Sequence, residues 1–178
     1  QSYPSHREEY ISQIDSLIPP PVYREAFAVG LSEDVQPLQT WSSEKFVYIE
    51  SGSGKDDLSA EMSFRWTTNY FYFQAVITDD VPIFNNKSEV DIWNGDCVEI
   101  CISLDENADK KREYFSGNDF QLGFSPGSKR DNIEPSAWGW GGLNKAPESV
   151  QLVISRTDNG YIVLGSIPWK SLSADFVP

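Results

Sequence analysis

The 178-residue chain carries 27 acidic and 14 basic side chains, so its formal net charge is −13. Such an excess of negative charge disfavours a duplex nucleic acid or an anionic membrane as partner, because both bind basic surfaces. Hydrophobic residues make up 39% of the chain, which is ordinary for one folded domain, and the sequence has no apolar run long enough to cross a membrane.

A short helix is predicted at the start of the chain, over residues 5–17. Ser5 and Glu8 form a capping box, and apolar side chains recur on one stripe behind it. Three consecutive prolines then stop the helix. We therefore expect a helix and proline spacer over residues 1–21 and a single β-sandwich over residues 22–178. The pattern leaves open whether the first part is a linker or a flap over the sandwich.

The rest of the chain is dominated by short segments of aromatic and β-branched residues separated by turns. These segments predict strands at residues 45–50, 58–66, 70–78, 96–104, 119–124, 150–155 and 161–167. No helical pattern alternates with them, so parallel βαβ units are not expected. The sequence predicts an all-β fold, an antiparallel β-sandwich with jelly-roll or immunoglobulin-like layers.

The two cysteines, Cys97 and Cys101, lie four residues apart in one predicted strand. At about 3.3 Å per residue they are about 13 Å apart, which is too far for a disulfide. We expect them to be buried free thiols. A cysteine–histidine metal site is not expected, because the single histidine, His6, belongs to the N-terminal segment.

Four segments together resemble a known family. They are residues 64–80, the sequence WNGDCVEICI at 93–102, DFQLGF at 119–124 and GYIVLGSIPW at 160–169. In this order they resemble the family 9 carbohydrate-binding modules and a wider group of sandwiches that includes haem-binding relatives. The resemblance spans about residues 58–170 and implies non-catalytic binding of an oligosaccharide or polysaccharide. It also implies an extracellular, periplasmic or cell-surface location, with an attached or neighbouring glycoside hydrolase as a partner.

The resemblance also implies particular binding residues. In that family the tryptophan of the WNGDCVE pattern is one wall of an aromatic clamp, and its glutamate hydrogen-bonds sugar hydroxyls. By position these are Trp93 and Glu99. Strand alternation agrees, since it places Glu99 on the face opposite Val98 and Ile100. Without the resemblance, the favoured interpretation of Glu99 is a solvent-facing or salt-bridged strand residue.

The chain departs from the family at several positions. Relatives carry an arginine and an asparagine where this chain has Gln121 and Gly123. Relatives also continue past the IPW strand with two more strands and a second clamp tryptophan, whereas this sequence ends at Pro178, so either it is a truncated piece or the second wall comes from elsewhere in the chain. The candidate substitutes are Trp138 and Trp140, which we expect in an exposed glycine-rich loop; the alternative is that both pack over the sandwich edge.

These departures leave a second hypothesis open beside carbohydrate binding: a structural or protein-interaction sandwich with a degenerate sugar site. A haem-binding sandwich is the third reading, with Met62 as the candidate iron ligand, although its spacing with aromatic neighbours is typical of a core residue. No cofactor is required by the pattern. Relatives often carry structural calcium, so the resemblance implies that the oxygen ligands of Asp105, Asn107 and Asp109 can hold such an ion. The alternative, which the acidic composition favours, is that these are solvated loop carboxylates.

No catalytic site is predicted. Glycoside hydrolysis needs two carboxylates on either side of one bond. Asp96 and Glu99 are three residues apart, so a regular strand points them to opposite faces. Pairs that are distant in the sequence remain open.

Overall fold

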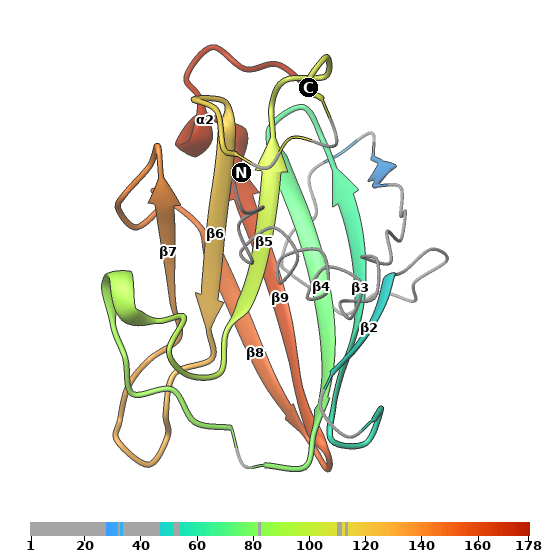
Figure 1. Ribbon diagram of the computed structural model, residues 1–178, viewed down its shortest axis with the longest axis vertical. Coiled ribbons are helices and arrows are strands. Elements are labelled where there is room, and N and C mark those ends of the chain that lie inside the picture. Colours follow the sequence, from blue (N-terminus) through green and yellow to red (C-terminus); the bar gives the residue numbers. More distant parts are fainter. Residues whose placement is uncertain are drawn as a thin grey trace, which may run out of the picture.

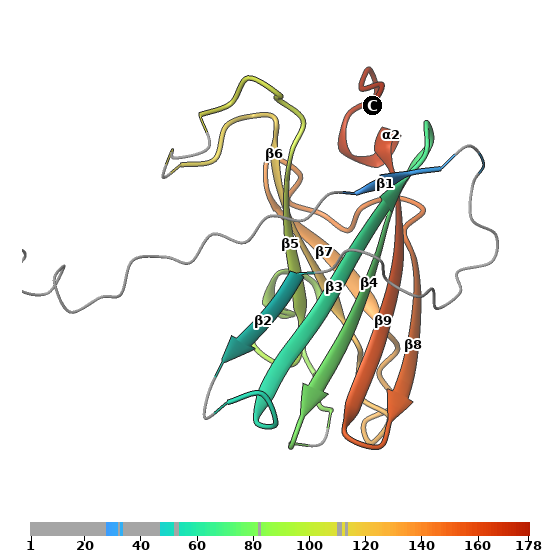
Figure 2. The same ribbon diagram turned by 90° about the vertical axis from the view of Figure 1, so that its right-hand side faces the viewer.

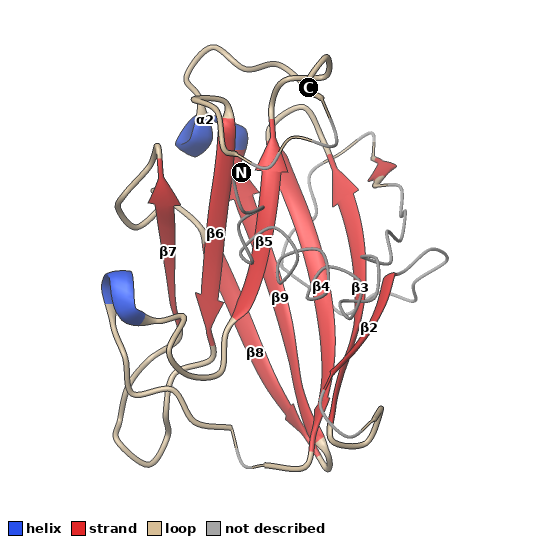
Figure 3. Cartoon of the chain, viewed as in Figure 1, coloured by secondary structure: helices blue, strands red, loops and turns tan. Residues whose placement is uncertain are grey.

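The computed structural model describes residues 28–31, 33, 47–51, 54–81, 83–109, 112 and 114–178. Nine strands are present in these residues (Figure 1): β1 (Val29–Gly30), β2 (Val47–Ser51), β3 (Leu58–Trp66), β4 (Tyr70–Asp79), β5 (Val98–Ser103), β6 (Asp119–Ser125), β7 (Ser136–Gly141), β8 (Gln151–Thr157) and β9 (Gly160–Pro168). Helical structure in the same residues is limited to η1 (Glu89–Asp91) and α2 (Trp169–Leu172), as Figure 3 shows. None of the helices described is long and apolar enough to cross a membrane. The helix and spacer predicted for residues 1–21 lie outside the described residues.

The strands form two layers, which confirms the predicted β-sandwich. The larger sheet has the order β1-β3-β4-β9-β8, with β2 also pairing with β3, and the smaller has the order β5-β6-β7. Neighbouring strands are antiparallel except for the parallel pair β1 and β3. Figure 1 shows the three-stranded sheet lying in front of the larger one.

The hydrophobic core lies between the two sheets, because every long strand points alternate side chains inward. Phe73 of β4 and Phe124 of β6 are both fully buried, and their ring centroids are 4.6 Å apart. Alternation predicts that Phe120, Leu122 and Phe124 of β6 point inward, as Val98 and Ile100 of β5 do, and burial confirms this. The other core residues include Met62, Ala75, Ile77, Tyr161, Val163, Ile167, Trp169 and Leu172. Met62 is therefore a core residue, which agrees with its spacing in the sequence.

The bounds of the predicted strands follow the sequence pattern closely, but two strands, β1 and β7, were not predicted. β3 has the predicted bounds, and the other predicted strands begin and end within two residues of them. β7 was expected as a loop and is a strand. Tryptophan and glycine alternate along β7, so the tryptophans share one face of the strand and the glycines the other. The glycine face has little room, since a Cβ at Gly139 would lie 2.4 Å from Leu143 Cδ2. The glycine that suggested a loop is thus required by packing.

Replacing Gly165 by alanine should destabilise the sandwich. A Cβ at this β9 position would lie 2.0 Å from Cε1 of the buried Phe73, so that ring would have to move. We expect Gly165→Ala to lower the free energy of unfolding by about 1–3 kcal/mol in urea titrations. Gly117→Ala is the control, because nothing lies within 4 Å of a Cβ there. Equal unfolding midpoints for the two variants would contradict this account of the core.

Candidate functional site

The outer face of the three-stranded sheet collects most of the candidate residues. Glu99 on β5 pairs with Gly123 on β6, and Gly123 pairs in turn with Trp138 on β7. The next row along joins Cys101, Gln121 and Trp140 in the same way. Because paired residues of antiparallel strands share a face, both rows point away from the core.

Glu99 and Gln121 form the polar centre of this face. Glu99 is exposed, Gln121 is half-buried, and the Gln121 side-chain amide Nε2 donates a hydrogen bond of 2.8 Å to Glu99 Oε2. The partner of Glu99 in the described residues is thus an amide and not a cation. A carboxylate has about four lone-pair sites on two oxygens, so it can accept hydrogen bonds from a ligand while it keeps this one.

Gly123 makes room for the indole ring of Trp140. A Cβ on Gly123 would lie 2.5 Å from Trp140 Cη2 and 3.1 Å from Cys97 Sγ. The ring of Trp140 therefore lies over the position where relatives were expected to carry an asparagine side chain. The missing polar group is replaced by an aromatic surface beside Glu99.

Trp138 and Trp140 are strand residues of β7, so the expected exposed loop is wrong. Both side chains are half-buried, and Trp140 Nε1 donates a hydrogen bond of 3.0 Å to the carbonyl of Val90 next to the sheet. Trp138 Nε1 is buried and has no hydrogen-bond partner in the part of the chain that the structure describes. The two indole rings therefore lie along the outer face of the sheet and do not project from it.

Trp93 lies in the segment between η1 and β5, and its side chain is 58% exposed. Its neighbour Ile92 is fully buried and anchors the segment. The hydrogen bond from Trp140 to Val90 joins η1, which directly precedes this segment, to β7. Trp93 is therefore an exposed aromatic ring on a backbone that is held at two points.

Asn85 holds this segment from inside the fold. It is fully buried, and its Nδ2 donates to the carbonyls of Ile92 (2.7 Å) and Asp96 (2.8 Å). Its Oδ1 accepts the amide of Lys87 at 2.9 Å. Asp96 adds a second tie, because its carboxylate accepts the backbone amide of Phe84. Sequence reasoning did not find Asn85, since nothing local distinguishes it from other loop asparagines.

The two cysteines are free, as predicted, but only Cys97 is largely covered, whereas Cys101 is exposed. The expectation that both are buried is therefore wrong: Cys97 is half-buried, and Cys101 is exposed because the outer face lacks a covering layer at that position. Burial raises the pKa of the Cys97 thiol to about 12, and the nearby carboxylates of Glu99 and Asp96 act in the same direction. Burial, with Glu99 and Asp119 nearby, also raises the pKa of Cys101. Both thiols are thus protonated at neutral pH.

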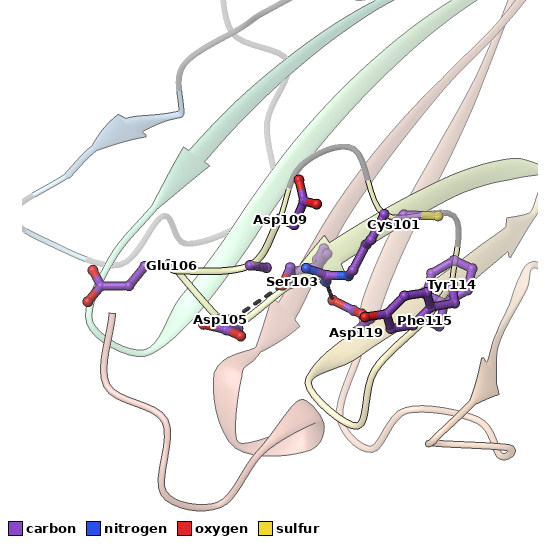
Figure 4. Close-up of a pocket in the computed structure, with 11 residues that line it drawn as sticks. Cys101, Ser103, Asp105, Glu106, Asp109, Tyr114, Phe115 and Asp119 are labelled. Carbon is purple, nitrogen blue, oxygen red and sulfur yellow. Dashed lines mark hydrogen bonds and ion pairs between the residues drawn. The ribbon is translucent and has the colours of Figure 1, made fainter.

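The predicted calcium ligands lie in the connection between β5 and β6. Asp105 Oδ1 accepts the backbone amide of Asn107 at 3.0 Å, which is a local turn. Figure 4 shows the side chains of Asp105, Glu106 and Asp109 pointing in different directions. No cluster of three or more histidine, cysteine or acidic side chains that could hold a metal ion occurs within the described residues. Calcium binding stays a prediction.

Asp119, the first residue of β6, holds the C-terminal part of the same connection in place. Its side chain is 5% exposed, forms an ion pair with Arg112 and accepts the backbone amide of Ser116. These contacts, the Ser116 hydrogen bond first, hold the pKa of Asp119 well below its usual 3.8.

Residues 36–176 match the model of the family described as "Carbohydrate family 9 binding domain-like". The chain belongs to that family. This confirms the resemblance drawn from the sequence motifs.

Among curated proteins, the chain is 29% identical over 124 residues to endo-1,4-beta-xylanase A of Thermotoga maritima and 31% identical over 120 residues to an exoglucanase of Acetivibrio thermocellus. These matches cover 70% and 67% of this chain and 10% of each relative. The chain thus spans about a tenth of the length of the curated relatives.

Two solved structures share the fold. Both are carbohydrate-binding modules of family 9 from Caldicellulosiruptor kristjanssonii, one in complex with glucose and the other with cellotriose, with TM-scores of 0.54 and 0.51. Each is 14% identical to this chain. The match to the glucose complex covers 85% of this chain and 71% of that structure, and the match to the cellotriose complex covers 80% and 67%. At this identity the likeness establishes the sandwich architecture.

Removing the Asn85 side chain should loosen the segment that presents Trp93. The carbonyls of Ile92 and Asp96 would lose their buried donor, so Asn85→Ala should lower the free energy of unfolding by about 1–3 kcal/mol. Urea denaturation measures the change. Asn118→Ala, at an exposed asparagine, should leave stability almost unchanged; a comparable loss in that control would remove the special role given to Asn85.

The low pKa of Asp119 predicts a particular dependence of stability on pH. A carboxylate whose pKa is depressed by folding stabilises the fold above its unfolded pKa and loses this effect as the pH falls through the folded pKa. Asp119→Asn should therefore be less stable than wild type at neutral pH, and the gap should narrow below about pH 4. Chemical denaturation at a series of pH values tests this. A gap that is independent of pH would show that the charge of Asp119 does not contribute.

Proposed function

We propose that the outer face of the three-stranded sheet binds an oligosaccharide or polysaccharide without cleaving it. The observation that carries the proposal is the hydrogen-bonded pair of Glu99 and Gln121 beside the indole of Trp140. A sugar ring presents hydroxyls at its edge and apolar C–H groups on its faces. Carboxylate and amide groups match the edge, and aromatic rings match the faces.

Each residue has a distinct role in this proposal. Trp93, the most exposed of these rings, stacks on a sugar unit. Glu99 accepts hydrogen bonds from hydroxyls, and Gln121 can both donate and accept. Trp138 and Trp140 lie half-buried on the sheet face that carries Glu99, so Trp93 is the one exposed ring of the clamp expected from the family.

Membership of the family supports sugar recognition, as do the glucose and cellotriose complexes of the two structural neighbours. The curated relatives are far longer proteins named as xylanases or an exoglucanase, which supports a glycoside hydrolase as attached or neighbouring partner. We propose that the module holds such an enzyme near its polysaccharide, outside the cell or at its surface. No catalytic step is assigned to this chain.

The alternative is a structural or protein-interaction sandwich whose sugar site has degenerated. The half-buried state of Trp138 and Trp140 favours it, because neither indole stands free as a second clamp wall. Haem binding has less support, since Met62 is only 7% exposed and packs in the core.

Replacing Trp93 by alanine should abolish most of the binding. Calorimetric titration with soluble oligosaccharides should show that Trp93→Ala binds them at least about tenfold more weakly than the wild type, because the exposed stacking surface is lost. Glu99→Gln should also weaken binding, since a neutral amide is a poorer acceptor than a carboxylate.

Val153→Ala is the control, at an exposed apolar position on β8 of the other sheet. Each titration is run with added calcium and with a chelator, which tests the calcium prediction at the same time. Failure of the wild type to bind any sugar of a broad panel, with its fold intact, would exclude the proposal and favour the protein-interaction alternative.

A further inference from the structure

The polar outer face does not end at Glu99. Side chains two residues apart on a strand share a face, and Glu99, Cys101 and Ser103 are all exposed on β5. At about 3.3 Å per residue, this row runs about 13 Å along the strand. It leads from the proposed sugar site toward the connection between β5 and β6.

A pocket of about 450 Å³ lies at the end of this row. Its walls come from Cys101 and Ser103 of β5 and from the connection that carries Asp105, Tyr114 and Phe115 (Figure 4). Ligand pockets in proteins usually measure about 300–1,000 Å³, so this one can hold a sugar-sized group. Cys101 belongs to the pocket and also pairs with Gln121, so the pocket adjoins the proposed site directly.

Two adjacent aromatic rings are exposed on this connection. Tyr114 is 71% exposed and Phe115 is 58% exposed, which are among the highest values for large apolar side chains in the described residues. Neighbouring aromatic rings left in water on a loop are typical of an interaction surface.

The backbone that carries these rings is held in place. Arg112 precedes them and forms an ion pair with Asp119, while Ser116 follows them and donates its amide to the same carboxylate. The side chains of Arg112 and Asp119 are only 15% and 5% exposed. Tyr114 and Phe115 therefore lie on a segment tied at both ends, which reduces the conformational entropy lost on binding.

The connection reaches outward from the sandwich on the side of the proposed site. Figure 2 shows the chain between β5 and β6 extending away from the six-stranded sheet, beyond the end of β5. The pocket shares Cys101 and Ser103 with the outward row on β5, and Cys101 pairs with Gln121 on the outer face.

We propose that the pocket lined by Tyr114 and Phe115 is a second sugar subsite, which holds more distant units of the same glycan chain that binds at Trp93, Glu99 and Gln121. The inference rests on the proposed function and extends it to chains of several units. Aromatic rings on one side of the pocket can face the C–H groups of a sugar unit, and the carboxylate of Asp105 lies on the other side (Figure 4). Asp105 Oδ1 already accepts the amide of Asn107, and the lone pairs that remain on this carboxylate can accept hydrogen bonds from sugar hydroxyls.

The test is a length series titrated by calorimetry, from the monosaccharide to the hexasaccharide of the polymer that the wild type binds. We expect wild-type affinity to rise with length. The double variant Tyr114→Ala/Phe115→Ala should bind the hexasaccharide about tenfold more weakly, and should bind the shortest sugars as the wild type does. Tyr114→Phe should retain the long-chain affinity, because it keeps the aromatic face. Val153→Ala again serves as the control at an exposed apolar position.

The outcomes separate this inference from the proposed function. Trp93→Ala should weaken binding of every length, whereas the double variant should affect only the long chains. Wild-type affinity that does not depend on length, or a double variant that binds the hexasaccharide like the wild type, would overturn the second subsite and leave the first intact. A wild type that binds no sugar would overturn both.

Discussion

β6 lies between β5 and β7, and its register with both strands decides which side chains share the outer face of the smaller sheet. A slip of one residue would exchange the two faces of the strand and bury Gln121 in place of Leu122. Leu122 is fully buried against the core, so burial of its side chain opposes such a slip. The hydrophobic packing between the sheets therefore also positions the polar pair on the far side.

Alternation along the strands was enough to predict both faces of β5 and β6. The sequence around Glu99 and around Gln121 has inward and outward positions that the structure confirms, because a half-buried strand must repeat every two residues. The family motifs then indicated which of the outward residues are candidates for sugar binding. Their roles in binding remain proposals, since burial and register determine where a side chain lies and not what it contacts.

The features that could not be predicted depend on contacts between distant residues. Glycines beside Trp138 and Trp140 indicated a loop, yet the close approach of Leu143 requires Gly139 in a strand. The link from Trp140 to Val90 joins residues 50 positions apart. Asn85 likewise acts through carbonyls on a separate segment. The local sequence shows which residues alternate along a strand, but it does not show which distant residues they contact.

Cys101 is exposed in a protein whose relatives include polysaccharide-degrading enzymes. Exchange with a disulfide requires the thiolate, and its rate falls when little thiolate is present at the ambient pH. The raised pKa values of Cys97 and Cys101 keep both sulfurs protonated. Although the sulfur of Cys101 is open to solvent, the small thiolate fraction slows its exchange with external disulfides.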